Sequence, residues 1–118
     1  MKQKEITIQG KQYPVIFTLA TIDSFEGITN KSFFEANLNT VRCRIALIMA
    51  AVLAADENTK LTVEDLRGNE DFESYNQINE AFIVVGELSK EFFKVTDSDK
   101  KSEAEEQGDN QEGEQGKN

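Results

Sequence analysis

Residues 41–55 read VRCRIALIMAAVLAA, and this stretch decides the fold of the chain. Of its 15 residues 13 are apolar, and the two exceptions are Arg42 and Arg44. Because apolar side chains cover nearly the whole circumference, we expect a buried central helix that begins after Asn39 or Thr40. Small side chains form one stripe, which lets a neighbouring element approach closely, and bulky ones form another. The small stripe is Cys43, Ala46, Ala50 and Ala54, and the bulky stripe is Val41, Ile45, Ile48 and Val52. Cys43 is expected to be a buried packing residue, with a reactive thiol as the alternative.

The segment before this helix predicts a β-hairpin and a short helix. Residues 5–9 alternate polar and apolar, and a second alternating set runs from Tyr13 to Leu19, with residues 10–12 as the loop. A period of three follows in Leu19, Ile22, Phe25 and Ile28. This period predicts an amphipathic helix that is capped by Thr18 or Thr21 and ends at Gly27 or Asn30.

The segment after the central helix predicts two more helices. Thr62 and Asp65 have the spacing of a capping box for a short helix over residues 63–67, which ends at Gly68-Asn69. A final amphipathic helix is expected from about Asp71 to Phe93. We therefore predict a mostly helical α+β fold, in which an N-terminal β-hairpin packs on a bundle of about four helices.

Composition divides the chain at residue 96. The 22 residues from Asp97 to Asn118 contain eight acidic residues, three lysines and one apolar side chain, Ala104. Such a segment buries too little apolar surface to offset its chain entropy, so we expect residues 97–118 to form a disordered acidic tail. Its function is either to keep the protein dispersed or to bind an electrostatic partner. Residues 1–96 are expected to form one globular domain.

The residue types available argue against chemistry and toward binding. The chain has one cysteine and no histidine, which excludes a disulfide framework, the usual zinc sites and histidine-activated nucleophiles. Its carboxylates are scattered, so we expect no catalytic residue, no cofactor-binding residue, no metal ligand and no enzyme. Thirteen basic residues against 22 acidic ones disfavour a nucleic-acid partner.

Membrane and export signals are not expected either. The longest apolar run, Ile45 to Ala55, has 11 residues, whereas a membrane-spanning helix needs about 20. The charged start, Met1 to Glu5, is followed by no apolar region of a signal peptide. We therefore expect a soluble intracellular protein that does not bind a membrane.

Three apolar pairs are the candidate partner-binding residues. They are Phe33-Phe34, Ile83-Val84 and Phe92-Phe93. Adjacent residues of a helix point about 100° apart, so one core face accommodates both members only in part. The pairs belong either to a core packed from several sides or to a surface for another chain, including a second copy of this one. Arg42 and Arg44 likewise either pair with local acids or bind an acidic partner.

The order of these patterns resembles the small tail assembly chaperones of long-tailed bacteriophages. The residues that carry the resemblance are Gly10 to Phe17, Leu19, Ile22, the stretch Phe25 to Thr29, the apolar helix Val41 to Ala55, the segment Leu61-Thr62-Val63-Glu64-Asp65-Leu66, and the final helix Asp71 to Phe93. The resemblance covers roughly residues 5 to 93 and contains no catalytic motif.

The resemblance implies a binding function in the bacterial cytoplasm. Proteins of this family coat the hydrophobic helices of the tape measure protein, recruit tail tube protein and are absent from the finished virion. The alternative hypotheses are another phage or mobile-element interaction module, such as an acidic inhibitor that mimics nucleic-acid charge, and a structural subunit retained in the particle.

Overall fold

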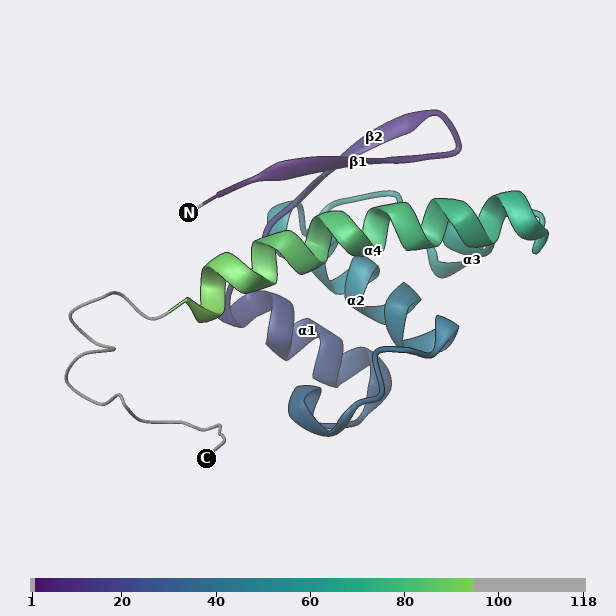
Figure 1. Ribbon diagram of the computed structural model, residues 1–118. Helices are drawn as coiled ribbons and strands as arrows, with labels where there is room; N and C mark the ends of the chain where they lie inside the picture. Colours follow the sequence, from purple (N-terminus) through teal and green to yellow (C-terminus); the bar gives the residue numbers. More distant parts are fainter. Residues whose placement is uncertain (1, 95–118) are drawn as a thin grey trace, which may run out of the picture.

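The computed structural model describes residues 2–94, in which an antiparallel hairpin is followed by helices (Figure 1). The elements are β1 (Lys4–Ile8), β2 (Lys11–Val15), α1 (Leu19–Thr29), the 3-10 turn η1 (Phe33–Glu35), α2 (Val41–Ala55), α3 (Val63–Arg67) and α4 (Phe72–Phe93). This order confirms the predicted α+β, mostly helical fold with one hairpin and four α-helices. The predicted acidic tail, residues 97–118, and the predicted domain end at residue 96 lie outside the described residues.

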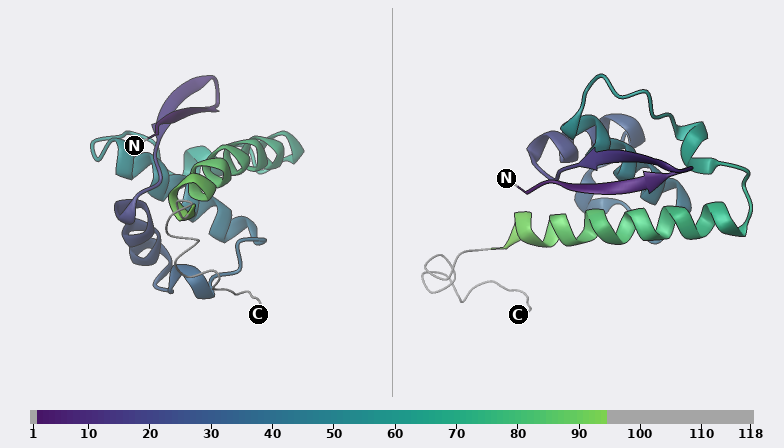
Figure 2. Two further views of the ribbon diagram at one scale, coloured as in Figure 1. Left: turned by 60° about the vertical axis from the view of Figure 1, so that its left-hand side comes forward. Right: turned by 90° about the horizontal axis from the view of Figure 1, so that it is seen from above.

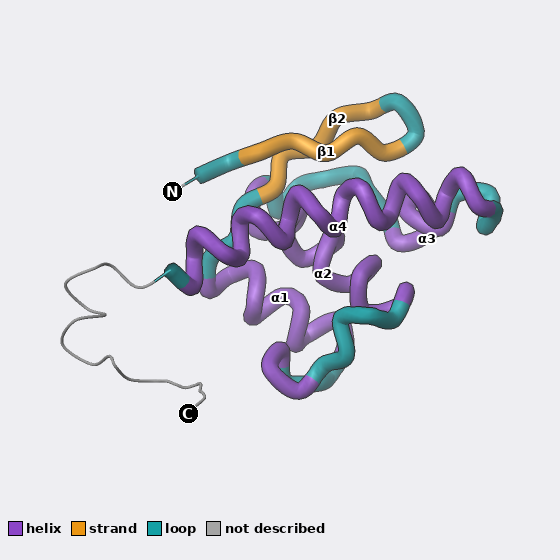
Figure 3. The backbone as a smooth tube through the Cα atoms, viewed as in Figure 1, coloured by secondary structure: helices purple, strands orange, loops and turns teal. Residues whose placement is uncertain are grey.

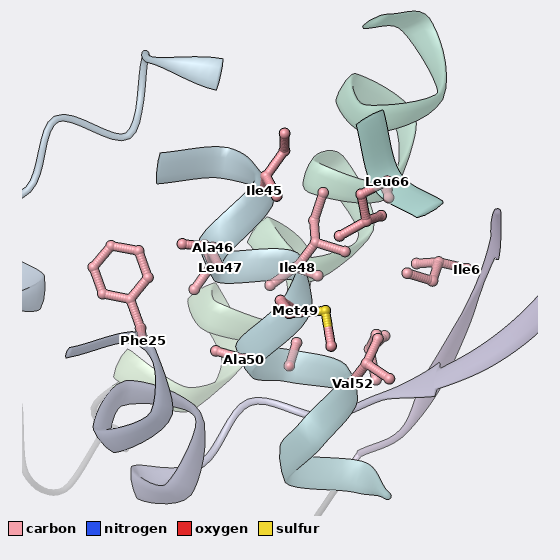
Figure 4. Packing of buried hydrophobic residues seen from close by; sticks show 14 of the residues in the cluster. Ile6, Phe25, Ile45, Ala46, Leu47, Ile48, Met49, Ala50, Val52 and Leu66 are labelled. Atoms are coloured by element: carbon pink, nitrogen blue, oxygen red, sulfur yellow. The ribbon is translucent and has the colours of Figure 1, made fainter. Parts of the chain in front are cut away.

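Helix α2 lies at the centre of the molecule, as its composition predicts. Nine of its 15 residues are buried, and side chains from α1, α3 and β1 converge on it (Figure 4). The small stripe lets a neighbouring element approach closely, as expected: Phe25 of α1 lies on the side of α2 that carries Ala46 and Ala50 (Figure 4). The bulky stripe is buried except at Val41, which is 44% exposed. Val41 is the first helical residue, and a surface hollow opens beside it.

The hairpin packs its apolar face against the helices (Figure 2). Ile6, Ile8 and Val15 are buried, and the backbone N–H of Ile16 donates to the carbonyl of Ala51 in α2 at 3.3 Å. The predicted loop over residues 10–12 is wrong by one or two residues. The turn consists of Gln9 and Gly10, which have φ of 51° and 81°. Positive φ at both central residues is the geometry that suits the right-handed twist of the two strands, so Lys11 and Gln12 are free to join β2.

Polar contacts fix the hairpin along α4. The Lys4 ammonium lies 2.7 Å from a carboxylate oxygen of Glu87, and the hydrogen bond that it donates is the main cause that lowers the pKa of Glu87. At the turn, the backbone N–H of Gln9 donates to the side-chain oxygen of Gln77 at 2.6 Å. β1 therefore lies alongside most of α4, which covers one side of the core (Figures 1 and 2).

Helix α1 begins where the sequence predicts, but its buried face differs. Thr18 is the N-cap, and its backbone N–H donates to the hydroxyl of Thr21, which itself donates to the carbonyl of Ile16 at 3.0 Å. These bonds turn Thr21 and Phe25 into the core, so Leu19 is 73% exposed and Ile28 is exposed too. The predicted apolar face through Leu19 and Ile28 is therefore wrong. The helix continues past Gly27 and ends at Asn30, whose φ is 59°.

The start signals of the last two helices are confirmed. Thr62 and Asp65 form the predicted capping box, and α3 ends at Gly68. Asp71 caps α4: its carboxylate accepts hydrogen bonds from the backbone N–H and the hydroxyl of Ser74, at 2.9 and 2.8 Å. The same Ser74 hydroxyl accepts the backbone N–H of Asn69 at 3.1 Å. A small polar network thus holds the chain between α3 and α4. This connection is part of the loop structure that is teal in Figure 3.

The cap at Asp71 makes stability depend on pH. The hydrogen bond from the Ser74 backbone N–H is the main cause that holds the pKa of Asp71 below its ordinary value of 3.8. Because the pKa is depressed in the folded state, the stabilisation is present above the ordinary pKa and is lost as pH falls through the folded pKa. In Asp71→Asn the amide oxygen still caps the helix but does not titrate.

We therefore expect the free energy of unfolding of wild type, relative to that of Asp71→Asn, to be higher at about pH 7 than at about pH 2.5. Urea unfolding of both proteins at the two pH values measures this difference. The remaining carboxylates titrate in both proteins and cancel. A difference that is the same at both pH values would contradict the assigned hydrogen bonds.

Candidate functional site

Four of the six predicted partner-binding residues come together where α4 ends. We call the group the aromatic cluster, and it consists of Phe17, Phe25, Phe33, Phe34, Phe92 and Phe93. Phe93 lies at its centre, with ring centroids 4.9 Å from Phe92, 5.7 Å from Phe17, 5.8 Å from Phe34 and 6.2 Å from Phe33. Most of these pairs meet at steep angles, as the quadrupoles of aromatic rings favour.

The aromatic cluster has a buried floor and an exposed top. Phe17, Phe25 and Phe33 are buried and continuous with the core. Phe34 is 74% exposed, Phe93 42% and Phe92 38%, although all three are in contact with the floor. Phe33 is therefore a core residue, whereas Phe34, Phe92 and Phe93 form a partly exposed apolar surface. That this surface binds another chain stays a prediction.

Local hydrogen bonds position η1 beneath α1. The backbone N–H of Phe33 donates to a carboxylate oxygen of Glu26 at 2.8 Å. Ser32, the residue before this turn, makes no side-chain cap bond. The Glu26 bond fixes the turn so that Phe33 points inward, and Phe34, the next residue, points outward.

The third predicted pair lies apart from the aromatic cluster. Ile83 is 60% exposed in the middle of α4. Val84 is half-buried and packs against the core. The exposed aromatic surface is built from the Phe34, Phe92 and Phe93 side chains.

Sequence reasoning missed Phe17 as a member of the site. Its place in an alternating run assigned it to a strand, whereas β2 ends at Val15 and Phe17 lies in the connection to α1. The Thr18 cap was the signal that could have found it, because a residue just before an N-cap often packs against the helix that follows.

The two arginines of α2 have different surroundings. The Arg44 guanidinium lies 4.6 Å from the centre of the Phe82 ring and donates to the Leu38 carbonyl at 2.9 Å and to the Asn79 side chain at 2.7 Å. Arg44 therefore ties α2 to α4. Arg42 is exposed and makes no ion pair within residues 2–94.

Within the described residues the site presents exposed apolar side chains. No three histidine, cysteine, aspartate or glutamate side chains in that part of the chain gather closely enough to hold a metal ion. The predicted buried position of Cys43 is confirmed. None of the helices within residues 2–94 combines the length and the apolar character needed to cross a bilayer.

Comparison with known proteins assigns no relative. The chain matches no protein-family model, no curated protein and no solved structure.

Proposed function

We propose that this chain is a tail assembly chaperone of a long-tailed bacteriophage, which acts in the bacterial cytoplasm and is missing from the mature virion. It binds the tape measure protein, keeps its hydrophobic helices from aggregating and recruits tail tube protein. The proposal begins from the resemblance in the order of sequence patterns.

The observation that supports it most is the exposed top of the aromatic cluster. Phe34, Phe92 and Phe93 offer three large apolar side chains that rest on a buried aromatic floor, and Phe93 contacts the other two. Clustered aromatic side chains of limited rotamer freedom lose little entropy on binding, and they dominate the energetics of many interfaces. An apolar helix face of a partner would cover them, as in helix-in-groove recognition.

The test is co-expression with the tape measure protein encoded beside this chain. We expect wild type to keep the tape measure protein in the soluble fraction and to co-purify with it. Phe34→Ala is expected to lower the yield of the complex at least about tenfold, because an aromatic hot spot is worth about 2 kcal/mol or more.

Phe72→Ala is the matched control. Phe72 is as exposed as Phe34, at 74%, but lies at the opposite end of α4. We expect this variant to bind the tape measure protein as wild type does. If wild type neither solubilises nor binds the tape measure protein, the chaperone proposal is wrong. If wild type binds and Phe34→Ala binds equally well, the aromatic cluster is the wrong surface.

A further inference from the structure

A second surface, which we call the basic groove, lies at the other end of α4. Its main hollow has a volume of about 360 Å³ and opens between the starts of α2 and α4 and the end of α3. Val41, Ile45, Tyr75 and Ile78 give it apolar walls. An adjoining hollow of about 220 Å³ shares Arg42, Ile45 and Arg67 with it and extends to Ile28 and Lys31 at the end of α1.

The lining of the basic groove carries more cations than carboxylates, in a chain whose formal charge is −9. The cations are Lys31, Arg42 and Arg67. Arg67 lies 3.8 Å from Glu70, but Lys31 and Arg42 make no ion pair within residues 2–94. The remaining carboxylate of the lining, Asp71, accepts the Ser74 hydrogen bonds of the α4 cap and keeps its negative charge, so three cations and two carboxylates give the lining a net charge of +1.

The position of Arg42 adds to this positive potential. It stands in the first turn of α2, which contains no acidic residue. The unpaired N–H groups at the start of a helix favour anions, so a cation there is unfavourable unless a negative group lies nearby. Arg44, in the same turn, is accounted for by its contacts with Phe82, Asn79 and Leu38. Within residues 2–94, Arg42 makes no such contact.

We propose that the basic groove binds an acidic amphipathic segment of a partner protein. Apolar side chains of that segment lie over Val41, Ile45 and Tyr75, and carboxylates beside them pair with Arg42 and Lys31. Val41 and Tyr75 are 44% and 45% exposed, so a partner gains apolar contact by covering them. This surface is separate from the aromatic cluster, and the inference holds whether or not the chain is a chaperone.

The acidic stretch of the chain itself is the competing occupant. Residues 97–118 are acidic and so are opposite in charge to the cations of the groove, but they contain a single apolar side chain, Ala104. They would leave the apolar walls of the groove uncovered. A segment that combines acidic and apolar residues satisfies both features, which is why the groove favours a partner over the chain's own tail.

The test uses the full chain and two synthetic peptides of equal length. Both carry leucines at helical spacing; one has glutamates at the flanking positions and the other has lysines. We expect the glutamate peptide to bind at least tenfold more tightly in fluorescence anisotropy, with an affinity that falls as salt is raised. Amide NMR signals are expected to shift in residues 41–45 and 74–78.

Arg42→Glu is expected to weaken the glutamate peptide at least tenfold. Lys60→Glu, the same charge change in the loop after the opposite end of α2, is expected to weaken it less than about twofold. Equal binding of the two peptides, no binding of either, or shifts confined to Phe34, Phe92 and Phe93 would overturn the proposal. If Arg42→Glu in the free protein shifts the amide signals of residues 103–114, the tail is the occupant and the partner proposal is wrong.

Discussion

Replacing Phe25 with alanine is expected to lower the free energy of unfolding by about 3–5 kcal/mol. The Phe25 side chain is 0% exposed, and its ring meets that of Phe33 at 5.4 Å, nearly edge-on. Its neighbours on α2 are the small residues Ala46 and Ala50, which have no side-chain length with which to fill the space (Figure 4). The truncation therefore leaves a cavity that the helices close only in part.

A loss of this size is a large share of the total for a small domain, which is about 5–15 kcal/mol. Urea unfolding of the full chain, followed by circular dichroism, measures it. Leu19→Ala is the control, since Leu19 lies on the same helix but is 73% exposed, and its replacement is expected to cost less than about 0.5 kcal/mol. Equal losses in the two variants would mean that α1 does not pack on α2 through Phe25.

Local signals in the sequence predicted most elements of the fold. Thirteen apolar residues among the 15 of residues 41–55 identified α2. The caps expected at Thr40 and Thr62 and the helix start expected at about Asp71 are confirmed. These signals act within one turn of the chain, because each of these caps accepts the backbone N–H of the residue three positions on. They are therefore readable without knowledge of the tertiary structure.

Features that depend on tertiary contacts were not predictable in the same way. The periodicity of α1 gave Leu19 and Ile28 the same weight as Phe25, but the bond from Thr21 to the Ile16 carbonyl decides which face points inward. The aromatic cluster was predicted only as separate pairs. It forms because the connection after β2, the turn η1 and the end of α4 meet, and no local pattern specifies that meeting.

The basic groove illustrates the same limit. Arg42 and Arg67 are 25 positions apart in the sequence, yet they line one hollow with Tyr75. The sequence could raise only the question of whether Arg42 and Arg44 pair with acids or bind an acidic partner. In the structure the two arginines differ. Arg44 contacts the Phe82 ring, the Leu38 carbonyl and the Asn79 amide, whereas Arg42 is exposed beside the apolar walls of the groove.

The positions of the two surfaces bear on what each can bind. Helix α4 has 22 residues and is therefore about 33 Å long. The aromatic cluster lies at its end and the basic groove at its beginning. One partner chain that spans this distance could occupy both surfaces, and so could two different partners. Variants at Phe34 and Arg42 test the surfaces separately, since the two residues share no described contact.

Gly68→Ala is expected to lower the free energy of unfolding by about 2–4 kcal/mol, from backbone strain and weakened hydrogen bonds together. Gly68 ends α3 with φ of 55° and ψ of −129°, a region that residues with a side chain rarely adopt. A Cβ at this position would lie 2.6 Å from the Ser74 hydroxyl oxygen. That oxygen has little freedom to move, because it is bonded to Asp71 and to the backbone of Asn69.

Gly86→Ala is the matched substitution with the opposite expected sign. Gly86 lies inside α4, and a Cβ there would meet no atom within 4 Å. Alanine should therefore stabilise the helix by about 1 kcal/mol through its higher helix propensity. Urea unfolding of both variants measures the two changes against wild type. Because both replace glycine with alanine, they alter the entropy of the unfolded chain alike, so the difference reports the local geometry. If Gly68→Ala is as stable as Gly86→Ala, the positive φ assigned to Gly68 and the Ser74 hydrogen bonds assigned between α3 and α4 would be contradicted.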